Sequence, residues 1–184
     1  DSRVLDVTVS DEKIAILKHA VVFAESLLVF SKYAQFALSS DTTFTADRIV
    51  TNVSTRFESS TRARPVGAGK NIFFPVFRGE WSGLREYYVD PNNDSNDASD
   101  ITSHIPSYLD GEIIELASSA NEDLIICSTE NNPGTLYIYS YFWKGNEKVV
   151  SAWSTWETDG SILGFSFVGS NLVALVLRDG DYSL

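Results

Sequence analysis

Short apolar runs alternate with polar turns along most of the chain. The runs are four to eight residues long and rich in Val, Ile, Phe and Tyr, and the segments between them are rich in Gly, Asn, Asp and Ser. This pattern is typical of β-strands joined by tight turns. We therefore expect an all-β fold built from antiparallel strands.

The predicted strands recur in a fixed order. The most apolar run of each unit begins near Leu27, Ile72, Leu124 and Leu172, at spacings of 45, 52 and 48 residues. Each of these runs follows a shorter apolar run and a polar turn, and the first three are followed by a further strand. Spacings in this range are typical of β-propeller blades. We expect propeller-like blades of antiparallel strands in a single segment, about three and a half repeats, with units over residues 11–58, 59–110, 111–159 and 160–184.

Two alternatives to this architecture remain open. A β-sandwich could contain similar hairpins by chance. In residues 11–30, apolar side chains also fall at helical spacing, so a short helix could lead into a strand at Val21; they are Ile14, Leu17, Val21, Ala24 and Leu28.

The size of the propeller is a separate question. A six-bladed propeller needs roughly 270 residues, more than this chain of 184. The chain therefore forms a small four-bladed ring or part of a larger propeller. The missing Met and the short last unit favour the larger propeller.

Composition narrows the class of protein. The hydrophobic content of 43% excludes intrinsic disorder. The net charge of −11 argues against a broad basic surface for nucleic acid or for an anionic membrane. A single Cys, Cys127, excludes an internal disulfide framework and a Cys-based zinc site. The first fifteen residues do not resemble a signal peptide. The longest uncharged stretch, residues 160–177, is too short for a membrane helix and is interrupted by a predicted turn at Gly169.

Several segments of the chain carry a family resemblance. They lie at residues 30–40, 62–90, 100–111, 117–128 and 135–156, and include DITSHIPSYL, SSANEDL and YFWKGNEKVVSAWS. Together they make residues 29–156 resemble the tail tubular protein B (nozzle) family of short-tailed, podovirus-type bacteriophages.

This resemblance implies a structural virion protein made in the cytoplasm of the bacterial host. In the family, six copies form the distal tail tube, next to tail tubular protein A and the tail fibres. DNA passes through the tube, so duplex DNA is expected as a passing partner without specific binding. Family members are much longer than this chain, which is therefore expected to be an internal segment.

Candidate chemistry is sparse. Residues 90–97 place Asp and Asn at alternate positions, as in a calcium loop, but Ser95 and Ile101 stand where an EF-hand needs Gly and Glu. We interpret this stretch as a solvated turn. His19 and His104 are the only histidines, and no nucleophile elbow accompanies them. We expect no catalytic, cofactor-binding or metal-binding residues, no cofactor and no enzyme activity.

Charge is segregated along the sequence. No Lys or Arg occurs between Arg85 and Lys144, whereas the preceding stretch from Arg56 to Arg85 is basic. The acids of this interval are Glu86, Asp90, Asp94, Asp97, Asp100, Asp110, Glu112, Glu115, Glu122, Asp123 and Glu130. An acidic wall would repel phosphates and let a duplex slide past. The alternative is a generic acidic surface that maintains solubility.

Aromatic residues concentrate near the third repeat: Tyr137, Tyr139, Tyr141, Phe142, Trp143, Trp153 and Trp156. Alternating aromatics on a strand usually fill a core between sheets. The alternative is a cell-surface glycan-binding or glycan-hydrolysing tail module. A buried aromatic band would favour the structural function, whereas an exposed aromatic cleft beside paired carboxylates would favour the glycan function.

Overall fold

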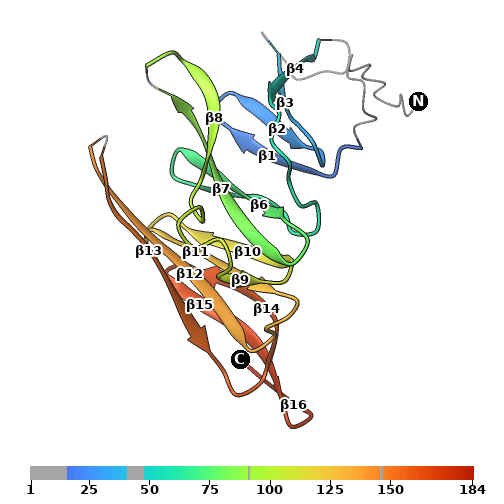
Figure 1. Cartoon of the computed structure of the whole chain (residues 1–184), viewed down its shortest axis with the longest axis vertical. Helices are drawn as coiled ribbons and strands as arrows, with labels where there is room; N and C mark the ends of the chain where they lie inside the picture. The colour runs from blue at the N-terminus through green and yellow to red at the C-terminus, as the bar shows by residue number, and fades with distance from the viewer. Residues whose placement is uncertain (1–15, 41–47, 91, 146) are drawn as a thin grey trace.

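The described part of the chain is entirely β. The computed structural model describes residues 16–40, 48–90, 92–145 and 147–184, and these ranges contain sixteen strands and no helix. The strands form four antiparallel sheets that follow one another along the chain (Figure 1). The predicted all-β fold of blade-like antiparallel sheets is confirmed.

The first sheet occupies the stretch in which the apolar spacing allowed a short helix. Its strands pair in chain order: β1 (His19–Phe23), β2 (Ser26–Phe30), β3 (Gln35–Ser39) and β4 (Val50–Thr55). A tight turn with Ala24 at φ 50° joins β1 to β2, and Val21 lies opposite Leu28 across this hairpin. The two side chains are therefore neighbours across a strand pair. A helix from Ile16 onward is wrong, and the remaining positions of that alternative, 11–15, lie outside the described residues.

The other three sheets repeat the same order. The second contains β5 (Val66–Ala68), β6 (Asn71–Phe77), β7 (Trp81–Asp90) and β8 (Ser95–Asp100), and the short β9 (Leu109–Asp110) also pairs with β7. The third contains β10 (Ile113–Ser119), β11 (Leu124–Thr129), β12 (Thr135–Lys144) and β13 (Glu147–Glu157). The fourth contains β14 (Ser161–Val168), β15 (Asn171–Arg178) and β16 (Asp181–Ser183). The four most apolar predicted runs are β2, β6, β11 and β15, the second strand of each sheet.

The uncharged stretch at residues 160–177 forms the β14–β15 hairpin. Gly169 adopts φ 62° in its turn, a conformation that glycine reaches without steric cost. The predicted turn at this position is confirmed. None of the described segments forms a helix of the length and apolar character that crossing a bilayer requires.

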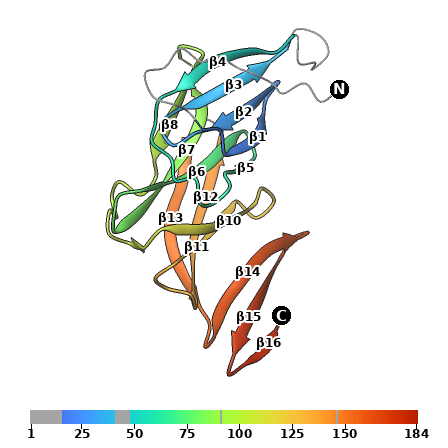
Figure 2. The same cartoon turned by 90° about the vertical axis from the view of Figure 1, so that its right-hand side faces the viewer.

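Successive sheets pack face to face. Phe30 of the first sheet contacts Phe74 of the second, with ring centroids 5.2 Å apart. Phe73 contacts Tyr139 of the third sheet, and Ile126 shares a core with the fourth. The sheets are thus arranged in series, as the two views show (Figures 1 and 2). The two-sheet sandwich is therefore wrong, because separate cores join one sheet to the next.

The apolar residues of the second strands divide by strand face. Leu28, Ile72, Phe73 and Ile126 are buried, whereas Leu27, Leu124, Leu172 and Val173 are half-buried. Adjacent residues on a strand face opposite sides of the sheet, so a sheet buries both only where both of its faces are covered. The second sheet does so: Ile72 packs toward the first sheet and Phe73 toward the third.

Candidate functional site: polar contacts between the sheets

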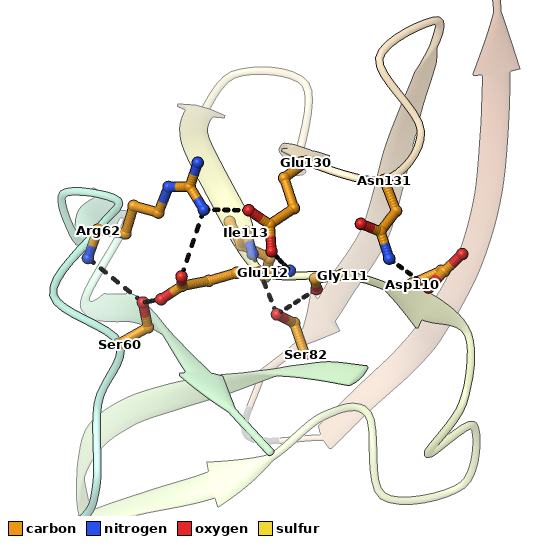
Figure 3. A network of polar contacts seen from close by, with 9 residues as sticks. All are labelled: Ser60, Arg62, Ser82, Asp110, Gly111, Glu112, Ile113, Glu130 and Asn131. Atoms are coloured by element: carbon orange, nitrogen blue, oxygen red, sulfur yellow. Dashed lines mark hydrogen bonds and ion pairs between the residues drawn. The ribbon is translucent and has the colours of Figure 1, made fainter. Parts of the chain in front are cut away.

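A polar network joins the loop before β5 to the third sheet (Figure 3). Ser60 Oγ donates a 2.6 Å hydrogen bond to Glu112 Oε1. The Arg62 guanidinium lies 3.4 Å from Glu112 Oε2 and forms an ion pair with Glu130. The backbone amide of Glu130 also donates to the carbonyl of Glu112. One arginine therefore binds both carboxylates that flank the β10–β11 hairpin.

The same network includes the second sheet. Ser82 Oγ at the start of β7 donates to the Gly111 carbonyl at 2.8 Å and accepts from the Ile113 amide at 3.0 Å. Gly111 has φ +87°, and a Cβ atom there would lie 2.8 Å from Asn131. A side chain at this position would therefore be both strained and obstructed. The close passage of the β9–β10 connection past Asn131 requires glycine.

The electrostatics of this network favour a structural role. The hydrogen bond from Arg62 lowers the pKa of Glu130 below its ordinary value, and Glu130 raises the pKa of Arg62. A carboxylate held ionised by an arginine is a poor proton acceptor near neutral pH. Among the residues that the structure describes, no group of three His, Cys, Asp or Glu side chains could hold a metal ion. The arrangement holds the sheets together through charge-assisted hydrogen bonds.

A second ion pair lies deeper, between β7 and β13. Lys148 contacts Glu86, and the two side chains are 17% and 4% exposed. Asn71 donates to the other carboxylate oxygen of Glu86 at 2.7 Å, and Lys148 also donates to the Tyr139 hydroxyl at 3.3 Å. Both oxygens of Glu86 are therefore satisfied. This pair fixes the outer part of β13 against the second sheet.

The acidic interval is divided in space. Its paired acids include Asp100 with Arg78 and both Glu112 and Glu130 with Arg62. Arg78 and Arg62 both belong to the basic stretch that precedes the interval. Lys148, which pairs with Glu86, comes after the interval in the sequence. At the opposite end of the strands, Asp94 lies in the β7–β8 hairpin and Glu122 in the β10–β11 turn, both exposed. Neither forms an ion pair with a described residue.

Residues 90–97 and the two histidines do not form a common site. Asp90 Oδ1 accepts hydrogen bonds from both nitrogens of Asn92, and Asn93 Oδ1 accepts from Ser95. These are local turn contacts at the tip of the β7–β8 hairpin. His19 Nε2 lies 2.8 Å from the carbonyl of Thr61, and His104 is exposed. His19 begins β1 of the first sheet, whereas His104 lies between β8 and β9. No described contact brings either histidine together with a nucleophile.

The aromatic cluster divides between core and surface. Tyr137, Tyr139 and Tyr141 are buried and Trp153 is half-buried, whereas Phe142, Trp143 and Trp156 are exposed. A shallow groove of about 550 Å³ lies elsewhere, between β4 and β8. No Trp or Tyr lines it; its residues are Val53, Ser54, Thr55, Arg56, Phe57, Asn96 and Asp97. The buried aromatic band favours the structural function.

These observations define an all-β protein in which stacked antiparallel sheets are joined by polar contacts. The chain matches the bacteriophage nozzle protein family over residues 1–184 and belongs to that family. It is also similar to tail tubular protein gp12 of Escherichia phage T7, with 34% identity over 158 residues. The predicted nozzle resemblance is confirmed, and the chain is part of a structural phage tail protein.

The relative is much longer than this chain. The match covers 85% of this chain but 20% of the T7 protein. The chain thus spans about a fifth of the length of the curated relative that it matches.

The contacts of the polar network were not predicted individually, because Arg62 lies 50 and 68 residues from Glu112 and Glu130. The available signal was the basic stretch directly before the acidic interval.

Proposed function

We propose that this chain forms part of the wall of a phage tail tube through which DNA is delivered to the host. Membership of the nozzle protein family is the observation that carries this proposal. The name of the T7 relative, a tail tubular protein, supports it. In this function the sheets form a rigid wall, and the ion pairs between them resist separation while the genome passes.

The proposed assembly follows the family resemblance. Six copies form a ring that contacts tail tubular protein A and the tail fibre protein. Residues 1–184 are one propeller-type segment, and its four units, 11–58, 59–110, 111–159 and 160–184, act as consecutive blades. The order of the four described sheets supports this division.

We propose further that the chain has no enzyme activity. The two carboxylates of the polar network are occupied by Arg62, and burial raises the pKa of the Cys127 thiol, which makes it a poor nucleophile at neutral pH. The exposed aromatics Phe142 and Trp156 do not line the groove between β4 and β8. We therefore do not favour the glycan-binding alternative.

Asp94 and Glu122 are exposed and form no ion pair with a described residue, so they are suited to face DNA. Asp94 and Glu122 lie at the end of the strands opposite the polar network. Exposed charges act over a Debye length of about 8 Å at physiological salt, and duplex DNA carries one negative charge per ~1.7 Å. Acidic groups within that distance repel the phosphates and oppose sticking.

Genome ejection tests this function. In the intact phage, Asp94→Lys together with Glu122→Lys should slow ejection at low salt, and added salt should restore the rate. The matched control is Glu80→Lys with Glu157→Lys, which makes the same charge change at exposed positions near the opposite end. If both pairs of substitutions leave ejection unchanged, the acidic residues do not face the DNA. If the protein is absent from purified tails, the tube-wall proposal fails.

A further inference from the structure

An amine, a carboxylate and a carboxamide meet between the second and third sheets. They belong to Lys148 of β13, Glu86 of β7 and Asn71 of β6. Lys148 is bonded to one oxygen of the Glu86 carboxylate, Oε2. Asn71 Nδ2 donates a 2.7 Å hydrogen bond to the other oxygen, Oε1. The carboxylate therefore holds the amine of one sheet and the carboxamide of the other side by side.

The register of the second sheet places the acid next to the amide. Glu86 lies directly opposite Phe73 in the β6–β7 pair. Asn71 precedes Phe73 by two residues and shares its face of β6, because side chains alternate along a strand. That face packs against the third sheet, where Phe73 and Tyr139 share a core. The position of the acid and the amide is thus fixed by two paired strands.

The amine reaches this pair from the third sheet. Lys148 lies opposite Trp143 near the tip of the β12–β13 hairpin. Its Nζ lies 4.9 Å from the centre of the Trp143 ring and donates to the Tyr139 hydroxyl at 3.3 Å. The Lys148 side chain is 17% exposed and that of Glu86 is 4% exposed. Lys148 is therefore directed inward among aromatic rings, where little water competes for its amine.

Proton transfer within this pair would create a nucleophile. Two buried charges pay a desolvation cost that their attraction offsets only in part. Moving one proton from the Lys148 ammonium to the Glu86 carboxylate removes both charges and leaves an amine beside a carboxylic acid. An uncharged amine attacks carbonyl carbons. The carboxamide of Asn71, bonded to the same acid, supplies such a carbon.

We propose that Lys148 and Asn71 form an intramolecular isopeptide bond, with Glu86 transferring the protons. Once Glu86 is protonated, the Asn71 amide turns about its last torsion, which is broad and roughly two-fold. Oδ1 then accepts a hydrogen bond from the acid, which polarises the carbonyl. Lys148 Nζ attacks Cγ and forms a tetrahedral intermediate.

The atoms and charges of this step balance without another reactant. In the intermediate, Glu86 gives its proton to Nδ2 of Asn71 and takes one from Nζ of Lys148. The bond between Cγ and Nδ2 breaks, ammonia leaves, and the bond between Nζ and Cγ remains as an amide. Glu86 ends protonated, so no buried charge is left without a partner. The reaction needs no oxidant, metal or cofactor.

The bond joins β6 to β13 and hence the second sheet to the third. A covalent link between residues far apart in sequence restricts the unfolded chain, as a disulfide does, and opposes separation of the two sheets. Each chain reacts once, so this is a self-modification without turnover. The inference does not depend on the tube-wall function, although a wall under load would benefit from the link.

Mass spectrometry of the complete protein tests the bond. After incubation of the folded protein, its intact mass should be lower than the mass of its sequence by one ammonia molecule. Digestion should yield a branched peptide that contains both Asn71 and Lys148. An unchanged intact mass would overturn the inference. Loss of ammonia without a branched peptide would also overturn it, because an asparagine that cyclises onto its own backbone loses ammonia too.

Three variants separate the chemistry from the ion pair. Lys148→Arg keeps a cation beside Glu86 but removes the amine, so it should form no branched peptide. Glu86→Gln keeps the shape of the side chain and should slow formation of the bond about a hundredfold or more, the usual contribution of acid–base catalysis. Lys144→Arg, at an exposed position of the same hairpin, is the matched control and should react like the wild type.

Circular dichroism checks the fold of each variant, and the wild-type mass decides on the bond even if a variant fails to fold. A branched peptide formed at the wild-type rate in folded Glu86→Gln would overturn the role of Glu86. A cross-link to Lys144 in place of Lys148 would overturn the assigned pair.

Discussion

Lys148 of β13 and Glu86 of β7 form an ion pair that joins the second and third sheets across 62 residues of sequence. Glu86 is almost completely buried and also accepts a hydrogen bond from Asn71. A buried charge is tolerated only when it is paired and hydrogen-bonded. This pair therefore makes the position of the β12–β13 hairpin depend on the second sheet.

Removing one partner should be strongly destabilising. Lys148→Met leaves Glu86 buried without its cation, and we expect a loss of about 3–5 kcal/mol in the free energy of unfolding. Arg178→Met is the control, because Arg178 and Asp159 form an exposed pair, whose loss should cost at most about 1 kcal/mol. Denaturant titration measures both. Equal losses for the two variants would contradict a role for burial.

The core between the second and third sheets should be sensitive to truncation. Phe73 is fully buried against Tyr139 and Tyr141, so Phe73→Ala should cost about 3–5 kcal/mol. Leu124→Ala should cost less, because Leu124 is half-buried. Leu163→Ala, at a position 51% exposed, provides the baseline in the same titration. A loss for Phe73→Ala no larger than that baseline would mean that these two sheets do not share a core.

Stability should fall in acid through the paired carboxylates. The hydrogen bond from Arg62 lowers the pKa of Glu130. Partial burial raises the pKa of Asp100, but hydrogen bonds from Thr102 and the charge of Arg78 outweigh it and leave that pKa lowered. Groups with a lowered pKa stabilise the fold above their ordinary pKa values, 4.5 and 3.8, and this stabilisation is lost as the pH falls through the folded values. Unfolding free energies measured from pH 6 to pH 3 should therefore decline less steeply in Arg62→Met than in the wild type; parallel declines would exclude the Arg62 contact as a cause.

The contribution of Glu115 to stability should depend on pH in the opposite direction. Desolvation between the third and fourth sheets raises its pKa, although an amide of Phe165 donates to it. A raised pKa means that its contribution to stability is present below pH 4.5 and is lost as the pH rises through the folded value. Glu115→Gln should therefore raise the melting temperature at pH 7, with the gain shrinking toward pH 4. A melting temperature unchanged or lowered at pH 7 would show that the ionised carboxylate is well accommodated.

The sequence predicted the strands well because their signals are local. The apolar runs at Leu27, Ile72, Leu124 and Leu172 all lie on second strands, since turn residues bound each run on both sides. The alternative helix near Val21 shows the limit of spacing alone. Side chains four or seven positions apart can also meet across a hairpin, as Val21 and Leu28 do.

The contacts between sheets could not be predicted in the same way. The pairing of Arg62 with Glu112 and Glu130 depends on how the sheets pack, and no local pattern specifies a partner 50 or 68 residues away. For the same reason, the sequence did not indicate which of the acids form ion pairs. The aromatic cluster was predicted as core, and it is core where the second sheet covers it, at Tyr139 and Tyr141.

Electron cryomicroscopy of the phage tail tests the central claim most directly. The account predicts that a reconstruction of intact particles contains the four consecutive sheets, repeated around the tail axis in the wall of the channel. Asp94 and Glu122 should face that channel. A reconstruction in which this protein is absent from the tail, or lies outside the channel wall, would contradict the account.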